Sequence, residues 1–350
     1  MILIKKISFL FLFFFFLGIM IYLLQERYNL RIETYTGMDE IRKIKSSKSG
    51  YTFPSAKNVN LPLREYCIKS SYNTALSGNY ISTDMIKYVL GRGCRFLDFE
   101  IFYINNTPCV AYSADPTFVT ITSKNFITLN EALKTIIVNG FTGPSPNAND
   151  PLFIHFRIKC QNPEIYNKIG MSVNNYLSSR LYNEKVTGST QLNLLVGQVI
   201  LIIDSNLSLD YKKIEYYPKC NLTNAVLSKD NCFDLSKYSN MDSGTSELRI
   251  YDANYLNDQS ITPPILINQE GDETDVSLLR IIVPNFTINE NNPSIHEFIQ
   301  NYGVQFISNS FYKNDKNLIE YEKFFFDNKS AFVTMSSAIR YFHKMNMESI

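Results

Sequence analysis

The stretch from Leu63 to Tyr112 constrains the fold more than any other part of this 350-residue chain. Its pattern predicts a strand over 64–69, a polar turn, a helix over 83–90 and a second strand over 95–101. A strand, a helix and a second strand in this order are typical of the opening βαβ unit of a parallel sheet. The sequence therefore favours an α/β fold.

Polar side chains follow the first predicted strand and line the second. Residues 70–74 come directly after the first strand, and Asp98 and Glu100 share one face of the second with Phe96. Active sites of parallel barrels lie at the carboxyl ends of the strands. Because carboxylate and amide oxygens are the ligands that Ca²⁺ takes, Asp98, Glu100 and Asn73 have the composition of a hard-cation site.

Size and charge limit the possible classes of protein. A chain of 350 residues with 45% hydrophobic composition can bury one large core, and a (β/α)₈ barrel takes about 250 residues. The net charge of +1 argues against a nucleic-acid partner. The six cysteines do not show metal-ligand spacing, so zinc is not expected.

Cysteines and glycosylation sequons give only weak signals of a lumenal or secreted location. Cys94, Cys109 and Cys160 fit buried apolar positions, whereas Cys220 and Cys232 bracket a short loop and could pair if that region is lumenal. Five sequons of the form Asn-x-Ser/Thr occur, at Asn105, Asn206, Asn221, Asn285 and Asn328. In an Asn-rich chain such sequons arise by chance, so they carry little weight alone.

An uncharged run near the N-terminus, Ile7 to Leu24, is long enough to cross a bilayer. At ~1.5 Å per residue its 18 residues (24 − 7 + 1) span about 27 Å. We expect a signal anchor over 1–27, with a cleaved signal peptide as the alternative, and a polar linker over 28–60. Basic residues flank the run on both sides, so the loop-charge rule leaves its orientation open.

Several short motifs together resemble the X box of phosphoinositide-specific phospholipase C. Residues 70–78 read SSYNTALSG where the family has SSHNTYLTG, and residues 92–95 read RGCR as in the family. Later, 248–251 resembles the family's RIY motif and 302–306 its GCQ strand. The resemblance implies an α/β fold, a phospholipase-C-like (β/α)₈ barrel, which here would lie behind the N-terminal transmembrane helix expected from the run 7–24. The implied barrel spans 61–335, with an X-like half (61–204), an irregular linker (205–244), a Y-like half (245–335) and a C-terminal tail (336–350).

The resemblance also implies a reaction that this chain is poorly equipped to catalyse. In the family the inositol 2-hydroxyl attacks phosphorus, assisted by Ca²⁺ and two histidines. The histidine positions fall on Tyr72 and Ser113, and neither side chain ordinarily titrates near neutrality. Of the three histidines, His155 lies in a predicted strand, where we expect it to line the barrel or its core.

The family's calcium site is altered as well. Asn73, Asp98 and Glu100 fall on three ligand positions, but the fourth, a glutamate in the family, falls on Arg157. We expect Arg157 to replace the ion by pairing with Asp98 and Glu100, the alternative being that it points outward. No cofactor is therefore expected.

Two function classes follow from the resemblance. The first is a catalytically inactive membrane protein retained as a phosphoinositide-binding, anion-binding or structural module, with Arg249 and Tyr251 as the retained headgroup-binding residues. The second is a divergent, metal-independent phosphoric diester hydrolase acting on phosphatidylinositol-type lipids. The expected partner in both is a membrane lipid.

Overall fold

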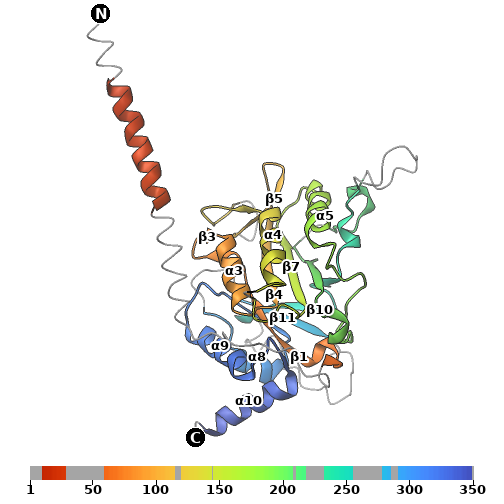
Figure 1. Ribbon diagram of the computed structural model, residues 1–350. Coiled ribbons are helices and arrows are strands. Elements are labelled where there is room, and N and C mark those ends of the chain that lie inside the picture. Colours follow the sequence, from red (N-terminus) through yellow and green to blue (C-terminus); the bar gives the residue numbers. More distant parts are fainter. Residues whose placement is uncertain are drawn as a thin grey trace, which may run out of the picture.

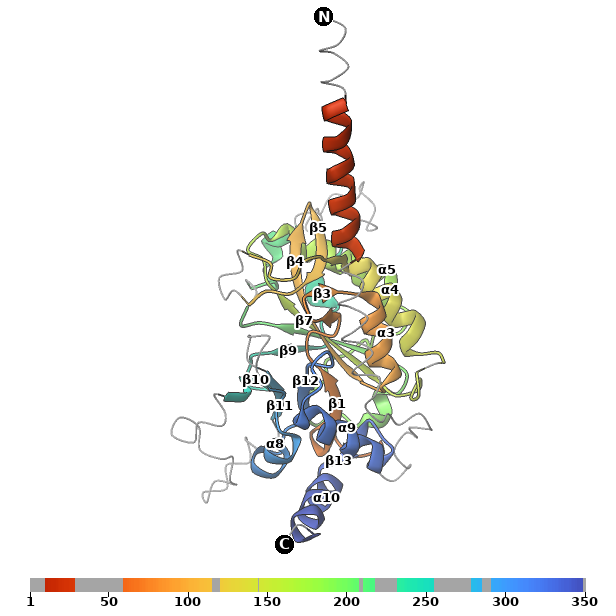
Figure 2. The ribbon, with the colours of Figure 1, turned by 90° about the vertical axis from the view of Figure 1, so that its left-hand side faces the viewer.

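The computed structural model describes residues 10–28, 59–114, 120–143, 145–207, 210–217, 232–254, 278–284 and 291–348. In this part of the chain, parallel strands form a nearly closed barrel in the order β10-β11-β12-β1-β4-β7-β8-β9 (Figures 1 and 2). The strands are β1 (Tyr66–Ser71), β4 (Phe96–Ile104), β7 (Leu152–Ile158), β8 (Val199–Asp204), β9 (Met241–Ser243), β10 (Leu248–Asp252), β11 (Leu279–Val283) and β12 (Phe306–Asn309). The predicted barrel architecture is confirmed.

The barrel ladder is interrupted between β9 and β10. Only residues 244–247 connect these two strands, whereas a crossover between adjacent parallel strands takes about a dozen residues or more. The link turns at Gly244, which has a φ of 80° and donates its backbone N–H to Leu248 O over 2.9 Å. The short link therefore explains why the two strands do not pair in register.

Helices cover the outside of the barrel in two groups (Figures 1 and 2). The first group is α3 (Thr83–Gly91), α4 (Leu129–Gly140) and α5 (Glu164–Leu177), and the second is α8 (Ile295–Tyr302), α9 (Lys316–Asn328) and α10 (Met335–Glu348). Polar caps define their starts: Ser82 accepts from Asp84 N at α3, and Thr128 with Glu131 forms a capping box at α4.

Short elements complete the described part. A β-hairpin extends β4 through β5 (Thr107–Ala111), which pairs antiparallel with it. The remaining strands are β2 (Leu76–Ser77), β3 (Tyr80–Ile81), β6 (Ile127–Thr128) and β13 (Phe332–Thr334). The 3₁₀ helices are η1 (Leu63–Glu65), η2 (Leu192–Leu195), η3 (Ile214–Tyr216) and η6 (Leu235–Lys237).

Three sequence expectations need correction. The region 205–244, expected to be irregular, contains η3, η6 and the barrel strand β9, which is too short to produce a periodic pattern. The expected tail forms α10, where Phe342 stacks on Phe324 of α9 with ring centroids 5.2 Å apart. The first strand runs two residues later than predicted, because a 3₁₀ helix occupies Leu63–Glu65 and the backbones of Ser70 and Ser71 pair with β12 and β4.

Alternation along the strands divides the core into an inner and an outer layer. Phe96, Phe153 and Phe306 fill the barrel interior, with the Phe96 and Phe306 ring centroids 4.8 Å apart. The residues that follow two of them, Leu97 and Ile154, pack outward against the helices. The aromatic layer closes the interior near the amino ends of β4 and β7, so polar side chains can gather only towards the carboxyl ends.

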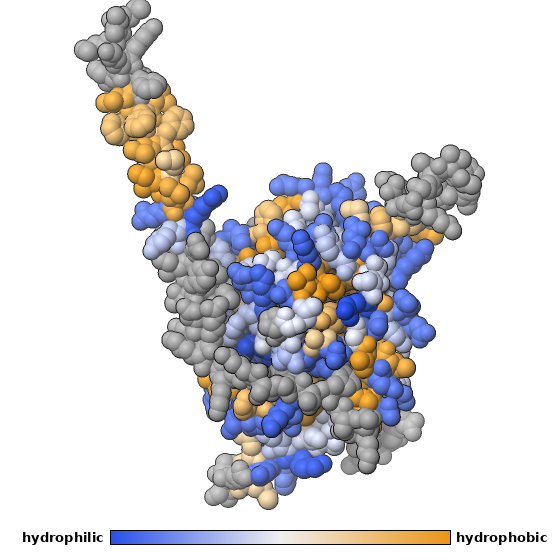
Figure 3. All heavy atoms as spheres, in the orientation of Figure 1, coloured by the Kyte–Doolittle hydropathy of each residue, from blue (hydrophilic) through white to orange (hydrophobic). Residues whose placement is uncertain are grey.

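The helix Leu10–Tyr28 differs from the helices of the barrel in exposing its apolar side chains. It is long and apolar enough to cross a membrane, and its apolar side chains are exposed all along it (Figure 3). A signal sequence would have the same properties. The predicted linker 28–60 lies outside the described residues except at its ends.

Candidate functional site

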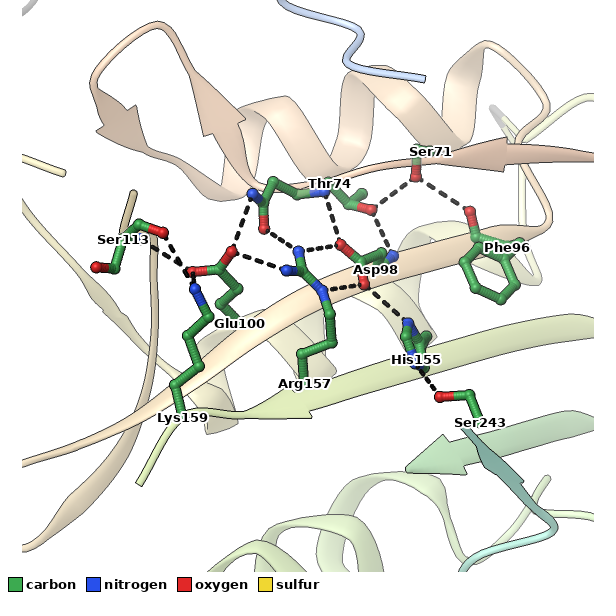
Figure 4. A network of polar contacts seen from close by, with 11 residues as sticks. Ser71, Thr74, Phe96, Asp98, Glu100, Ser113, His155, Arg157, Lys159 and Ser243 are labelled. Atoms are coloured by element: carbon green, nitrogen blue, oxygen red, sulfur yellow. Dashed lines mark hydrogen bonds and ion pairs between the residues drawn. The ribbon is translucent and has the colours of Figure 1, made fainter. Parts of the chain in front are cut away.

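The candidate site is built on two neighbouring strands, β4 and β7. Their register places Asp98 beside His155 and Glu100 beside Arg157. Paired residues of parallel strands point to the same face, so all of these side chains enter the barrel interior (Figure 4). Both strands are buried along this stretch, which removes the network from bulk water.

Arg157 lies at the centre of this network. Its Nε and Nη2 donate to the Asp98 carboxylate over 2.9 and 2.6 Å, and its Nη1 donates to Glu100 Oε1 over 2.9 Å. A further bond, of 2.9 Å, runs from Nη2 to Asn73 Oδ1. The structure thus brings together Asn73, Asp98, Glu100 and Arg157, and the guanidinium points inward rather than to a helix interface.

The charges of Arg157 and Asp98 stabilise one another despite burial. Burial opposes the charged guanidinium, but Asp98, Tyr72 and Glu100 outweigh it and hold the pKa of Arg157 well above its ordinary value. Burial likewise works against an ionised Asp98, yet Arg157 and His155 hold the pKa of that carboxyl well below its usual range. Both groups are therefore charged at neutral pH.

The turn after β1 completes the cage around Asp98. Asn73 adopts a left-handed backbone conformation with a φ of 41°, which asparagine tolerates better than most residues. Its backbone N–H donates to Asp98 Oδ2 over 3.0 Å, and Thr74 Oγ1 accepts from Asp98 N over 2.9 Å. This conformation directs the Asn73 side chain towards Arg157 and Glu100.

Lys159 is a second buried cation that the sequence analysis did not identify. Its Nζ lies 3.1 Å from Glu100 Oε2 and donates to the Ser113 carbonyl over 3.1 Å. Ser113 N also donates to Glu100 Oε2, over 2.9 Å. The position of Lys159 two residues after Arg157 was the available signal, because every second residue of a strand shares a face.

His155 links the network to the next strands. One ring nitrogen, Nδ1, lies 2.9 Å from Asp98 Oδ1 and the other, Nε2, lies 2.8 Å from Ser243 Oγ, and all three side chains are fully buried. The expected lining position is therefore observed, with both ring nitrogens bonded. Ser243 was missed because β9 was not predicted.

The two positions that correspond to the family's histidines are also buried. The Tyr72 ring lies over the Arg157 guanidinium, 4.6 Å from ring centroid to Cζ, and burial raises the pKa of its hydroxyl well above the ordinary value. That hydroxyl has no hydrogen-bond partner among the described residues. Ser113 Oγ donates to Thr120 O. Neither group is poised to exchange a proton at neutral pH.

The residues present do not fit a calcium ion. Arg157 already donates to oxygens of Asn73, Asp98 and Glu100, which are the atoms that would coordinate the metal. Within the described ranges, no group of three or more His, Cys, Asp or Glu side chains is arranged to hold a metal ion. We therefore derive no catalytic step through calcium.

Arg249 and Tyr251 lie on a different face. On β10, Leu248 and Ile250 pack with the barrel interior, whereas Tyr251 packs with the outer core layer. The alternation places Arg249, which is exposed, on the same outer face as Tyr251, with 3.5 Å from its Nη1 to the tyrosine hydroxyl. The structure therefore does not bring this pair onto the inward face that carries Arg157.

Comparison with known families agrees with the motifs. The family described as phosphatidylinositol-specific phospholipase C, X domain, matches residues 59–202. The predicted resemblance to this family is confirmed. The matched range includes β4 and β7, which carry Asp98, Glu100 and Arg157, and also Tyr72, which directly follows β1. A search of curated proteins finds no match.

Two solved structures share the fold. The crystal structure of L. pealei PLC21 has a TM-score of 0.58 at 17% identity, over 79% of this chain and 37% of that chain. That of S. officinalis PLC21 has a TM-score of 0.56 at 16% identity, again over 79% and 37%. This chain therefore corresponds to little more than a third of each relative, and the likeness establishes the phospholipase-C-like phosphodiesterase fold.

Proposed function

We propose that this chain is a phospholipase-C-like barrel that has lost phosphodiester hydrolysis and acts at a membrane as a binding or structural module. The observation that carries the proposal is the Arg157 guanidinium, which is bonded to both Asp98 and Glu100. A metal ion or a phosphate would have to displace these charge-assisted bonds, which are the strong class of hydrogen bond in proteins.

The proton-transfer groups support the same conclusion. General acid–base catalysis typically contributes about 10²–10⁴-fold to a rate and needs a group that titrates near the working pH. Tyr72 has a strongly raised pKa, and Ser113 is bonded to Thr120 O. A barrel with these residues lacks the acid and base that the family reaction uses.

Charge balance limits where an anionic headgroup can bind. Inside the barrel, Arg157 and Lys159 are matched by Asp98 and Glu100, so these four groups leave no excess positive charge. Retained recognition of a phosphoinositide headgroup would therefore use the exposed outer face of β10, where Arg249 lies beside Tyr251.

Hydrolysis can be tested directly with the full chain in mixed micelles. We expect the release of inositol phosphate from phosphatidylinositol, with or without Ca²⁺, to equal that of a protein-free blank, for the wild type and for Tyr72→Phe alike. Hydrolysis above the blank would overturn the proposed inactivity. Headgroup recognition is tested with soluble inositol trisphosphate, which avoids the apolar helix. Affinity should fall at least tenfold in Arg249→Ala, a loss of about 1.4 kcal/mol.

A second candidate function is a metal-independent phosphoric diester hydrolase. The observation that favours it is His155, an imidazole that connects Asp98 with Ser243 at the carboxyl end of the barrel. This candidate predicts measurable hydrolysis that His155→Gln abolishes and Tyr72→Phe leaves intact. The same micelle assay therefore separates the two functions.

A further inference from the structure

The orientation of the helix Leu10–Tyr28 decides which compartment the barrel occupies. A cleaved signal peptide, or an anchor with its N-terminus in the cytoplasm, would place the barrel in the lumen or outside the cell. An anchor of the opposite orientation would leave it in the cytosol. Lys5 and Lys6 precede the apolar helix and Arg27 and Arg31 follow it, so flanking charge does not choose between these arrangements.

The state of Cys232 distinguishes the compartments. Cys232 is disulfide-bonded, while Cys67, Cys94, Cys109 and Cys160 are free. Its predicted partner, Cys220, lies outside the described residues. Disulfides persist in secreted and lumenal proteins and are rare in the reducing cytosol.

The segment that follows Cys232 is an integral part of the fold. Asn167 Nδ2 donates to Phe233 O over 3.5 Å, and a Cβ at Gly170 would lie 2.5 Å from the same oxygen, so the segment packs directly on α5. It then leads through η6, which Asp234 caps, into β9 and Ser243. The disulfide thus stands at the entry to a strand that contributes to the candidate site.

A glycosylation sequon occupies the tip of the β4–β5 hairpin. Asn105 and Asn106 form the turn with φ values of 48° and 58°, and both side chains are exposed. Two side chains bond to main-chain carbonyls at this tip: Thr107 Oγ1 donates to Asn105 O over 3.4 Å, and Lys168 Nζ donates to Asn106 O. Among the described residues the Asn105 side-chain amide makes no hydrogen bond, so it is available for modification.

The other described sequons are less available. Asn328 is half-buried and its Nδ2 donates to Phe324 O over 2.8 Å. The Asn206 amide packs over Gly244, with its atoms 2.4 to 2.6 Å from where a Cβ on that glycine would lie. Asn221 and Asn285 lie outside the described residues.

We propose that the barrel faces an oxidising compartment, lumenal or extracellular, and that Asn105 carries an N-linked glycan there. The helix supplies a route across the membrane, the Cys232 disulfide selects the side, and the hairpin tip presents an Asn-x-Thr acceptor away from the barrel core. Neither the compartment nor the glycan depends on whether the barrel hydrolyses lipid.

The glycan is tested by expressing the full chain in eukaryotic cells and treating it with peptide-N-glycosidase. We expect the treatment to lower the apparent mass of the wild type. Untreated Asn105→Gln should already run lower than the untreated wild type, by the mass of one glycan. Asn106→Gln is the matched control, because it changes the same turn but keeps the Asn-x-Thr sequon and should keep the glycan. A shift that Asn105→Gln leaves unchanged overturns the assignment to Asn105.

The compartment is tested by thiol labelling of the same material. With Cys232 paired to Cys220, denatured, unreduced protein should label only at the four free cysteines, and Cys232 should label only after reduction. Labelling of Cys232 without reduction, together with no glycosidase shift in any variant, would place the barrel in the cytosol and overturn the proposal.

Discussion

Two buried arginines at opposite ends of the barrel show how the same side chain is accommodated in different ways. Arg157 lies towards the carboxyl end of β7 and Arg95 immediately before β4, with exposed fractions of 1% and 0%. Arg157 bonds directly to the carboxylates of Asp98 and Glu100. Arg95 instead donates to neutral acceptors, which are Gly140 O (2.8 Å), Ser145 Oγ (2.6 Å) and Asn147 Oδ1 (2.6 Å).

Direct contact with a carboxylate decides the net direction in which the pKa of each buried arginine shifts. Burial lowers the pKa of Arg95 to about 10, whereas the carboxylates hold the pKa of Arg157 well above its ordinary value. The neighbouring acids differ in the same way: Asp98 has a depressed pKa, and burial raises the pKa of Asp150, near Arg95, to about 7. The guanidinium that bonds directly to carboxylates thus lies towards the carboxyl end of the barrel, where sites of this fold lie.

The largest expected effect is that of Arg157→Met on stability. The substitution removes the guanidinium from both buried carboxylates and leaves Asp98 with His155 and Glu100 with Lys159 as the remaining partners. Breaking a buried pair in this way typically costs about 3–5 kcal/mol. Chemical unfolding of detergent-solubilised protein, followed by circular dichroism, measures it. Adding Asp98→Asn should recover part of the loss, because Asp98 accepts two of the bonds that Arg157 donates, and an unaffected single variant would show that the network does not stabilise the fold.

The next effect is a dependence of stability on pH that arises from Asp150. Its pKa rises from 3.8 to about 7 on folding, so between these values the folded state binds a proton that the unfolded state has released. The contribution is fully present below pH 3.8 and is lost as the pH rises to about 7, by at most ~4 kcal/mol at about 1.4 kcal/mol per unit.

Unfolding free energies measured from pH 4 to 8 test this slope against Asp150→Asn, which should be flatter. Asp98 contributes nothing in that window, because its pKa is depressed: its stabilisation is present above pH 3.8 and is lost only as the pH falls through the lower folded value. Equal pH dependence of the unfolding free energy in the wild type and in Asp150→Asn would show that Asp150 does not cause the slope.

Arg95→Met should cost less than Arg157→Met. It removes the hydrogen bonds that Arg95 donates to the neutral acceptors Ser145, Asn147 and Gly140 O, at about 1–3 kcal/mol, and it leaves no ionised partner unpaired while Asp150 is protonated. The same unfolding experiment at pH 5 compares the two variants. An equal or larger loss in Arg95→Met would contradict the contrast between the two ends.

The smallest expected effect is that of calcium. A ligand stabilises a protein by RT ln(1 + [L]/Kd), and Arg157 already occupies the oxygens that the ion would use. Millimolar Ca²⁺ should therefore leave the melting temperature of the wild type nearly unchanged. A saturable increase that Asp98→Asn abolishes would show a specific site and would contradict the internal pairing.

The sequence predicted the barrel class and much of the site region because the relevant signals are local. The helix 83–90, the face shared by Asp98 and Glu100, and the motifs at 70–78 and 92–95 all follow from neighbouring residues. Arg157 also came from sequence, through the resemblance, and its proposed pairing agrees with the bonds it makes.

Tertiary structure alone decided which distant groups join that region. Ser243 meets His155 only because β9 pairs with β8, and a strand of the length of Met241–Ser243 leaves no periodic pattern in the sequence. The outward position of Arg249 is decided by the register of β10 on β11, since one residue of slip exchanges the two faces of a strand. Local patterning determines which elements form and which faces are apolar, whereas pairing register, a long-range property, determines which polar side chains share the barrel interior.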